Sequence, residues 1–529
     1  MKPEPVRLRK ELGLLEGFTL IMGNVIGSGI FVAPKGVITY VGSVGMSLAV
    51  WAVSGLLTML GGLCFTELGT MIPQTGGMYV YLHEAFGPLP AFLYLWVTVV
   101  LRNNATAAVV ALTFASYLIQ GVTGGCEAVP DAAVRLLAAI LICFLSWVNC
   151  MNVKWAAKVQ NVFTLSKVVA LVVVIVTGAV HLGAGHLDNY HGVMAGTNWK
   201  AGAIATAFYQ SLFSYDGWDK VYYVAEELKN PERDLPIAIF LATTLLTVLY
   251  TLTNAAYLAV LTPAEMISSG AVALVCGDGQ GWFSWLTVTA LPLTHALNSF
   301  YCLQTFADRT LGVAARLMPI FVMCSTFGTI NGYILMQSRL IFAGARKGQL
   351  PEVFSLVSTV HMTPVVAIVV HGVLLLLMLV TSDVILLINY SIYAATLTHL
   401  GCMGALFWFR YKEPKRPRPF KVFLVLPVIF TVILVFLLVL PATQNPSDVG
   451  VGIALISSGL PVYYFTIHRK DIAGKFTRLL GRLTVWCQVL FMGLPEMDRR
   501  LASAAAADDD DGVGGNTSRR TSRNDTHCD

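Results

Sequence analysis

Long apolar runs separated by short polar connections dominate the hydrophobic pattern of this chain. Twelve runs reach the length of about 20 residues that a helix needs to cross the hydrocarbon core of a bilayer. They lie at residues 13–39, 46–72, 88–119, 131–151, 155–183, 200–225, 235–261, 311–341, 364–381, 384–409, 420–441 and 449–468. The pattern predicts an all-α membrane protein with twelve transmembrane helices.

The loops between these runs differ in their content of Lys and Arg. Basic residues gather in the N-terminus and in the stretches 154–158, 229–233, 346–347, 410–421 and from 469 onwards. The stretches 40–45, 181–197, 381–383 and 441–450 contain no Lys or Arg. Because cytoplasmic loops carry an excess of basic residues, the alternation predicts a multi-pass protein with both termini in the cytoplasm.

Composition supports a membrane protein and a simple domain organisation. Of 529 residues, 56% are hydrophobic and 12% are charged, whereas soluble proteins average about 25% charged residues. The net charge of +5 follows from the basic loops and does not indicate nucleic-acid binding. We expect a cytoplasmic N-terminus at 1–12, a membrane-spanning domain at 13–468, a cytoplasmic C-terminal region at 469–501 and a disordered, polar tail at 502–529.

The first apolar run contains the glycine-rich stretch GNVIGSGIF at residues 23–31. Gly27 and Gly29 flank Ser28, and glycine weakens a helix by about 0.5–1 kcal/mol relative to alanine. An interrupted helix in a membrane leaves polar backbone groups free, which is tolerated where they line a cavity or bind a ligand. The alternative is a packing face of small residues.

A second interruption is predicted in the sixth run, within FSYDGW at residues 213–218. Asp216 beside Gly217 costs about 2.5–3.5 kcal/mol in a membrane segment and therefore indicates a functional site. An ion pair or a helix cap is the alternative. Interruptions at corresponding positions of two five-helix halves are typical of transporters with inverted repeats, so Gly27–Gly29 and Ser214–Gly217 are predicted to form the walls of one site.

Two further residues carry specific predictions. Lys167 lies inside the fifth apolar run, where its ammonium either occupies the place of a coupled cation or snorkels to the membrane surface. Cys126 lies in a short connection that the predicted topology places outside the cell. An unpaired external cysteine is either linked to another chain or a free thiol. The ten cysteines form no Cys-x-x-Cys or Cys/His spacing typical of a metal site.

Several motifs together resemble the light chains of heterodimeric amino-acid transporters, a branch of the amino acid–polyamine–organocation group. They are IGSGIFVAPK at 26–35, CFTELGTM at 64–71, FGPLP at 86–90, FSYDGW at 213–218, AEELKNPERDLP at 225–236, SRL at 338–340, GARKG at 344–348 and RPFKV at 418–422. The resemblance implies a LeuT-type fold, in which a 5+5 inverted repeat with broken helices 1 and 6 is followed by two C-terminal helices. It also implies a plasma-membrane antiporter.

The resemblance also assigns roles to residues of both interruptions. The amides of Ser28, Gly29 and Ile30 would hold the substrate carboxylate. The substrate amino group would meet backbone carbonyls or side chains of Val25, Gly27, Phe213, Ser214 and Asp216. Phe213 would close over the substrate as an aromatic gate.

In the same comparison, Lys167 matches a lysine that replaces a sodium site, which implies sodium-independent exchange. Cys126 matches the cysteine that forms a disulfide with a single-span glycoprotein heavy chain. No cofactor is expected, and no constellation of catalytic side chains indicates an enzyme.

Substrate choice is predicted from charge and size. The Asp216 carboxylate favours cationic over acidic side chains, and the small Ala394 and Ala395 leave room for long ones. We therefore predict exchange of neutral and cationic amino acids. The alternatives are a cystine/glutamate-type exchanger, a purely neutral L-type exchanger and an ion-coupled symporter. Glu226 and Glu227 are predicted to form a gate or structural ion pairs with Arg233.

One segment departs from the family pattern. Residues 275–304 separate AVAL at 271–274 from TFADR at 305–309, two motifs that the relatives join directly. The inserted segment is moderately apolar and shows no complete further span. Its ends are compatible with splice-site codons, and we interpret the insert as a retained intron in the gene model.

Overall fold

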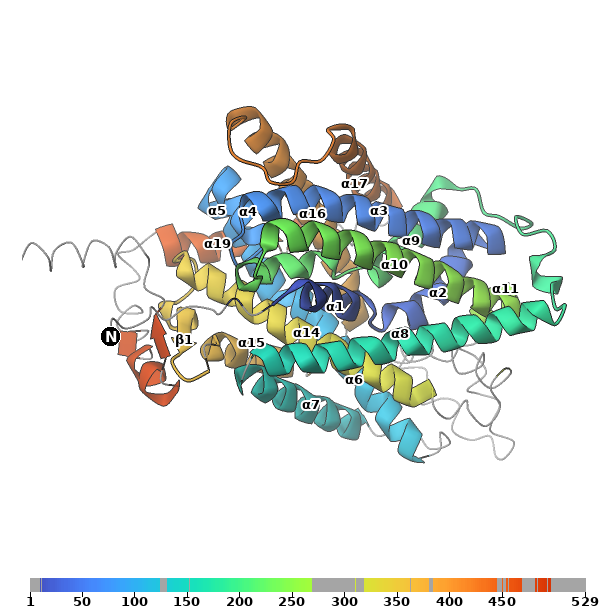
Figure 1. The fold of residues 1–529 in the computed structure, drawn as a ribbon, viewed down its shortest axis with the longest axis horizontal. Helices are drawn as coiled ribbons and strands as arrows, with labels where there is room; N and C mark the ends of the chain where they lie inside the picture. Colours follow the sequence, from blue (N-terminus) through green and yellow to red (C-terminus); the bar gives the residue numbers. More distant parts are fainter. Residues whose placement is uncertain are drawn as a thin grey trace, which may run out of the picture.

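The computed structural model is a bundle of helices, most of which run along its long axis (Figure 1). It describes residues 10, 12–123, 131–151, 153–268, 310, 318–361, 363–379, 384–444, 450, 453–454, 456–468, 481–482, 484–491 and 493–495. Cys126, the segment 275–304 and the tail 502–529 therefore lie outside the described residues.

The first apolar run forms two helices separated by a bend. Helix α1 (Leu14–Val25) ends where the Ile26 amide donates to the Met22 carbonyl, and α2 (Gly29–Val41) begins three residues later. The Gly27 amide turns back to the Val25 carbonyl at 2.8 Å. The first amides of a helix have no carbonyl partner within that helix, so the Gly29 and Ile30 amides lie at a helix start inside the bundle.

The sixth run is also interrupted. Helix α9 (Ala201–Ser214) ends in a turn at 215–217, and the 3₁₀ helix η3 (Trp218–Glu227) follows before α10 (Pro231–Val260). Gly217 opens η3 with φ of +110°, a conformation that residues with a Cβ atom rarely adopt. The glycine beside Asp216 is thus required by the backbone of the turn.

The two interruptions lie against each other. A Cβ atom placed on Gly29 would be 2.7 Å from the Ser214 Cα atom, and one on Gly217 would be 3.2 Å from the carbonyl carbon of Asn24. Both contacts are with backbone atoms, which cannot move aside as a flexible side chain can. Only glycine therefore allows this approach at both positions.

The other helices pack around this contact. Helix α3 (Val44–Met71) lies along α10, α2 lies along α9, and α14 (Met318–Arg346) packs against α6 (Asn103–Thr123) and α8 (Val153–Gly183). The remaining helices are α4 (Met78–Phe86), α5 (Pro88–Val97), η1 (Thr98–Arg102), α7 (Asp131–Met151), η2 (Asp188–Tyr190), α11 (Pro263–Ser268), η7 (Glu352–Ser355), α15 (Val365–Met378), α16 (Val384–Lys412), α17 (Val425–Gln444), α19 (Gly459–Tyr463) and η8 (Tyr464–His468).

One small ribbon accompanies the helices of this all-α fold. Strand β1 (Leu356–Ser358) pairs antiparallel with β2 (Gly493–Pro495), with Leu356 opposite Pro495. Leu356 and Val357 are buried there, so the ribbon covers apolar side chains. A strand of three residues carries too short a pattern to be recognised in the sequence.

The outer surface of the bundle is apolar, as a surface facing lipid must be. On α8, the exposed side chains of Val162, Leu165, Val169, Val172, Val176 and Val180 recur every three to four residues and form an outward stripe. Five helices of the described residues are long and apolar enough to cross a membrane: Val44–Met71, Ala132–Met151, Val162–Gly183, Pro231–Val260 and Pro319–Arg346. The chain is an α-helical membrane protein.

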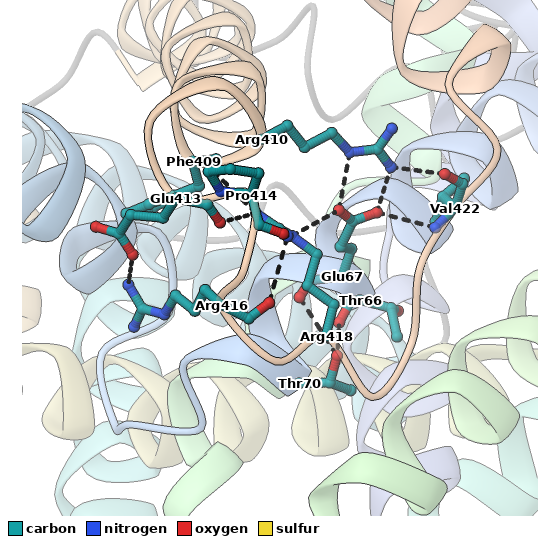
Figure 2. Close-up of polar contacts among 10 residues, drawn as sticks. All are labelled: Thr66, Glu67, Thr70, Phe409, Arg410, Glu413, Pro414, Arg416, Arg418 and Val422. Carbon is teal, nitrogen blue, oxygen red and sulfur yellow. Dashed lines mark hydrogen bonds and ion pairs between the residues drawn. The ribbon is translucent and has the colours of Figure 1, made fainter.

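A buried carboxylate joins α3 to the connection between α16 and α17. Glu67 has no exposed surface and accepts a hydrogen bond from the Val422 amide at 2.9 Å. Figure 2 shows its carboxylate between the guanidinium groups of Arg410 and Arg418. The CFTELGTM motif supplies Glu67 to this cluster, the RPFKV motif supplies Arg418 and Val422, and Arg410 comes from the end of α16.

We expect Gly29→Ala to destabilise the fold, because the added Cβ atom collides with the backbone of Ser214. Overpacking of this kind costs about 1–3 kcal/mol. Thermal unfolding of the purified protein measures the effect. The matched control is Gly183→Ala, where a Cβ atom meets nothing within 4 Å; equal behaviour of the two variants would contradict the role of the contact.

Candidate functional site

A cavity lies beside the second interruption and is bounded by helices from both halves of the chain. Its space for water-sized molecules is about 80 Å³. Phe213, Asp216 and Ala395 line it, so the structure brings three of the predicted site residues together. The other polar and aromatic residues of the lining are Thr58, Arg102, Thr106, Trp218, Thr396, His399 and Phe430.

Asp216 is paired with two basic residues. Its Oδ1 atom accepts a hydrogen bond from the Arg102 guanidinium at 2.9 Å, and its Oδ2 atom lies 3.7 Å from the Lys220 Nζ atom. The ion pair raised as an alternative from the sequence is therefore present. About a quarter of the Asp216 side chain is exposed, and this part faces the cavity. Arg102 and Lys220 offset its negative charge there.

Sequence reasoning missed four ionisable residues around this cavity. Arg102 ends η1, Asp219 and Lys220 lie in the first turn of η3, and His399 lies on α16. All four are buried. A signal was present, since ionisable residues within apolar membrane segments are rare and usually functional. Among the described residues, no three His, Cys, Asp or Glu side chains gather as a metal site.

The residues of the first interruption lie apart from the cavity lining. The Val25 carbonyl accepts a hydrogen bond from the Tyr250 hydroxyl at 2.9 Å, and the Gly27 carbonyl accepts one from Ser325 at 3.3 Å. Ser28 and Ile30 are buried. The predicted site residues thus form two groups, which meet at the contact between Gly29 and Ser214.

Lys167 points from α8 into the first interruption. Its Nζ atom donates to the Gly23 carbonyl at 2.6 Å and to the Thr329 hydroxyl at 2.8 Å, and the side chain has no exposed surface. The ammonium therefore does not snorkel to the membrane surface. It donates a hydrogen bond to the Gly23 carbonyl in the last turn of α1, where carbonyl groups lack partners within the helix.

The end of the bundle at which α1 begins is closed by pairs of charged residues. Glu227 and Arg339 are both fully buried, with Oε1 and Nε atoms 2.6 Å apart. Glu226 pairs with Arg346 at 3.0 Å. The prediction that Arg233 pairs with these carboxylates is wrong. Arg233 lies on the exposed first turn of α10, and the two carboxylates instead bind Arg339 and Arg346 of α14.

Two further contacts support this closure. The Leu12 amide donates to the Glu227 carbonyl at 3.1 Å, and the Lys229 amide donates to the Leu12 carbonyl at 2.9 Å. Burial alone would raise the pKa of Glu226, but Arg346 and the Thr75 amide lower it below its usual range. The carboxylate therefore stays ionised and paired at neutral pH.

The chain is similar to known proteins over most of its length. The sequence model of the family described as "Amino acid permease" matches residues 12–467. The chain is 39% identical over 497 residues to "Large neutral amino acids transporter small subunit 2" of Oryctolagus cuniculus, covering 93% of this chain and 87% of that protein.

Two other relatives from Mus musculus are similar over comparable lengths. "b(0,+)-type amino acid transporter 1" is 38% identical over 489 residues, which are 92% of this chain and 94% of the relative. "Asc-type amino acid transporter 1" is 38% identical over 499 residues, which are 93% of this chain and 88% of the relative.

We expect Glu227→Gln to lower the thermal stability of the purified protein by several degrees. Removing one member of a buried ion pair leaves the other charge uncompensated and costs about 3–5 kcal/mol. The exposed Glu232 on the first turn of α10 supplies the control Glu232→Gln. Equal unfolding temperatures of Glu227→Gln and the unmodified protein would show that the pair does not hold this end closed.

Proposed function

The chain belongs to the amino acid permease family, and we propose that it exchanges neutral and cationic amino acids independently of sodium by alternating access. Family membership makes it an amino-acid transporter and not an enzyme. The observation that carries the rest of the proposal is the contact between the two interrupted helices, which brings a helix start and a helix end together inside the bundle.

The substrate site we propose has two parts. The amides of Ser28, Gly29 and Ile30 at the start of α2 bind the α-carboxylate, because a helix N-terminus favours an anion. The amino group binds near the Val25 and Gly27 carbonyls and the turn at Ser214–Asp216. The side chain enters the cavity lined by Phe213 and Ala395. Gly29 and Ser214 must separate for the substrate to enter between them.

Exchange independent of sodium is supported by Lys167. Its ammonium binds the Gly23 carbonyl and the Thr329 hydroxyl, oxygen ligands of the type that a sodium ion would use. The lysine side chain fills the place that a transported cation would take. The carrier then returns across the membrane with another amino acid bound.

The Arg102–Asp216 ion pair favours a second candidate, a purely neutral exchanger. With Asp216 bound to Arg102 at 2.9 Å, the cavity offers no isolated carboxylate to a cationic substrate. A cationic side chain must compete with Arg102 for Asp216, whereas a neutral side chain leaves the pair intact. The two candidates differ only in the uptake of arginine and similar substrates.

Topology and assembly belong to the same proposal. We propose twelve spans arranged as a LeuT-type 5+5 inverted repeat with two further helices, and both termini in the cytoplasm. The closed end with Glu227 and Arg339 then faces the cytoplasm. A relative's name contains the words "small subunit", which supports a plasma-membrane heterodimer in which Cys126 forms a disulfide with a single-span heavy chain.

Counterflow in proteoliposomes tests the proposal. Vesicles loaded with unlabelled leucine are expected to accumulate labelled leucine and arginine at equal rates in sodium and choline buffers, and to accumulate glutamate poorly. Uptake of leucine without arginine would select the neutral exchanger. Uptake that requires sodium, or that occurs equally well into empty vesicles, would contradict exchange independent of sodium.

Lys167→Met is expected to reduce leucine counterflow at least ten-fold. Methionine fills the space but removes the two short hydrogen bonds from the Lys167 Nζ atom to the Gly23 carbonyl and the Thr329 hydroxyl, and the loss of buried hydrogen bonds is costly. Lys200→Met is the control, because Lys200 is exposed at the start of α9. Unchanged counterflow in Lys167→Met would contradict the proposed role of the ammonium.

A further inference from the structure

A histidine and an aspartate lie side by side next to the cavity of the proposed substrate site. His399 lines this cavity together with Asp216. Its Nε2 atom lies 3.9 Å from the Asp219 Oδ2 atom. The imidazole packs against two aromatic rings that also contact each other, with centroid distances of 5.5 Å to Phe65 and 5.3 Å to Trp218.

Asp219 is a buried carboxylate without hydrogen bonds. Only 1% of its side chain is exposed, and neither carboxylate oxygen has a hydrogen-bond partner within the described part of the chain. The same holds for the His399 Nε2 atom and for the Lys220 ammonium. A buried charge without hydrogen bonds is expensive. A proton on His399 would turn the His399–Asp219 contact into an ion pair and relieve that cost.

The charges around the cavity cancel except for His399. Arg102 and Lys220 are positive and Asp216 and Asp219 are negative, so these four residues together have no net charge. A neutral imidazole leaves the cluster neutral. A protonated imidazole makes the wall of the cavity positive by one charge, which repels a cationic substrate.

We propose that His399 and Asp219 form a proton-binding site whose occupancy opposes the binding of a cationic amino acid in the cavity. The inference rests on the proposed function, because it concerns which substrates the exchanger accepts. Binding of the proton and binding of a cationic side chain then exclude each other. The proton is bound while a neutral amino acid is carried, and it leaves when a cationic amino acid binds. His399 is a specificity-determining residue in this cycle.

Other titratable groups lie around the pair. They are Arg102 on η1, Asp216 in the turn, Lys220, Tyr222 and Tyr223 on η3, Tyr94 on α5 and Cys402 on α16, with Tyr333 of α14 against Lys220. Ordinary phenol, thiol, carboxyl and basic groups do not change charge between pH 5.5 and about 7.5, whereas histidine, with an ordinary pKa of about 6.5, does.

The test is the ratio of labelled arginine to leucine counterflow in proteoliposomes, measured at pH 5.5 and 7.5 with equal pH on both sides. In the unmodified protein, we expect the ratio at pH 5.5 to be at least five-fold lower than at pH 7.5. His399→Gln and Asp219→Asn should each have a ratio that changes less than two-fold over the same range. His191→Gln is the matched control, because His191 is exposed away from the cavity, and it should retain the five-fold change.

Each outcome decides the inference. A pH-independent ratio in the unmodified protein, or an unchanged pH dependence in both His399→Gln and Asp219→Asn, would overturn it. Leucine counterflow without arginine counterflow at either pH would also overturn it, because no cation then exchanges with the proton. Absence of leucine counterflow would instead contradict the proposed function itself, so the two failures are distinguishable.

Discussion

The contact between the two interrupted helices is the constraint on which the rest of the structure depends. Gly29 approaches the Ser214 backbone so closely that no Cβ atom fits. Three surrounding helices bind the carbonyl groups released by the first interruption: α8 through Lys167, α10 through Tyr250 and α14 through Ser325. Buried carbonyl groups need such partners. The polar residues of these helices are thus explained by the backbone that they surround.

Buried charges connect this centre to the end of the bundle where α1 begins. Glu227 with Arg339 and Glu67 with Arg410 join helices that are distant in the sequence. Because an isolated buried charge is so costly, each pair holds its helices together more firmly than an exposed pair would. Opening this end requires the two residues of each pair to separate or to become hydrated. Alternating access therefore requires these charged side chains to replace one another with water or with other polar groups.

Much of this architecture could be predicted from the sequence, and the remainder depends on tertiary packing. The interruptions were predictable because Gly27, Gly29 and Gly217 violate helix preferences within apolar runs. The partners in the ion pairs could not be predicted from the sequence. Arg339 and Arg346 reach Glu227 and Glu226 only because α14 packs against η3. Arg102, which pairs with Asp216, was missed for the same reason, because it lies inside an apolar run more than a hundred residues earlier in the chain.

The central claim is that the two interruptions together bind the amino acid. A structure of the purified transporter determined with bound leucine tests it most directly. The account predicts the leucine carboxylate within hydrogen-bond distance of the Gly29 and Ile30 amides, the leucine side chain in the cavity beside Phe213, and a wider separation of Gly29 from Ser214. Leucine bound elsewhere, with Gly29 and Ser214 still in contact, would contradict it.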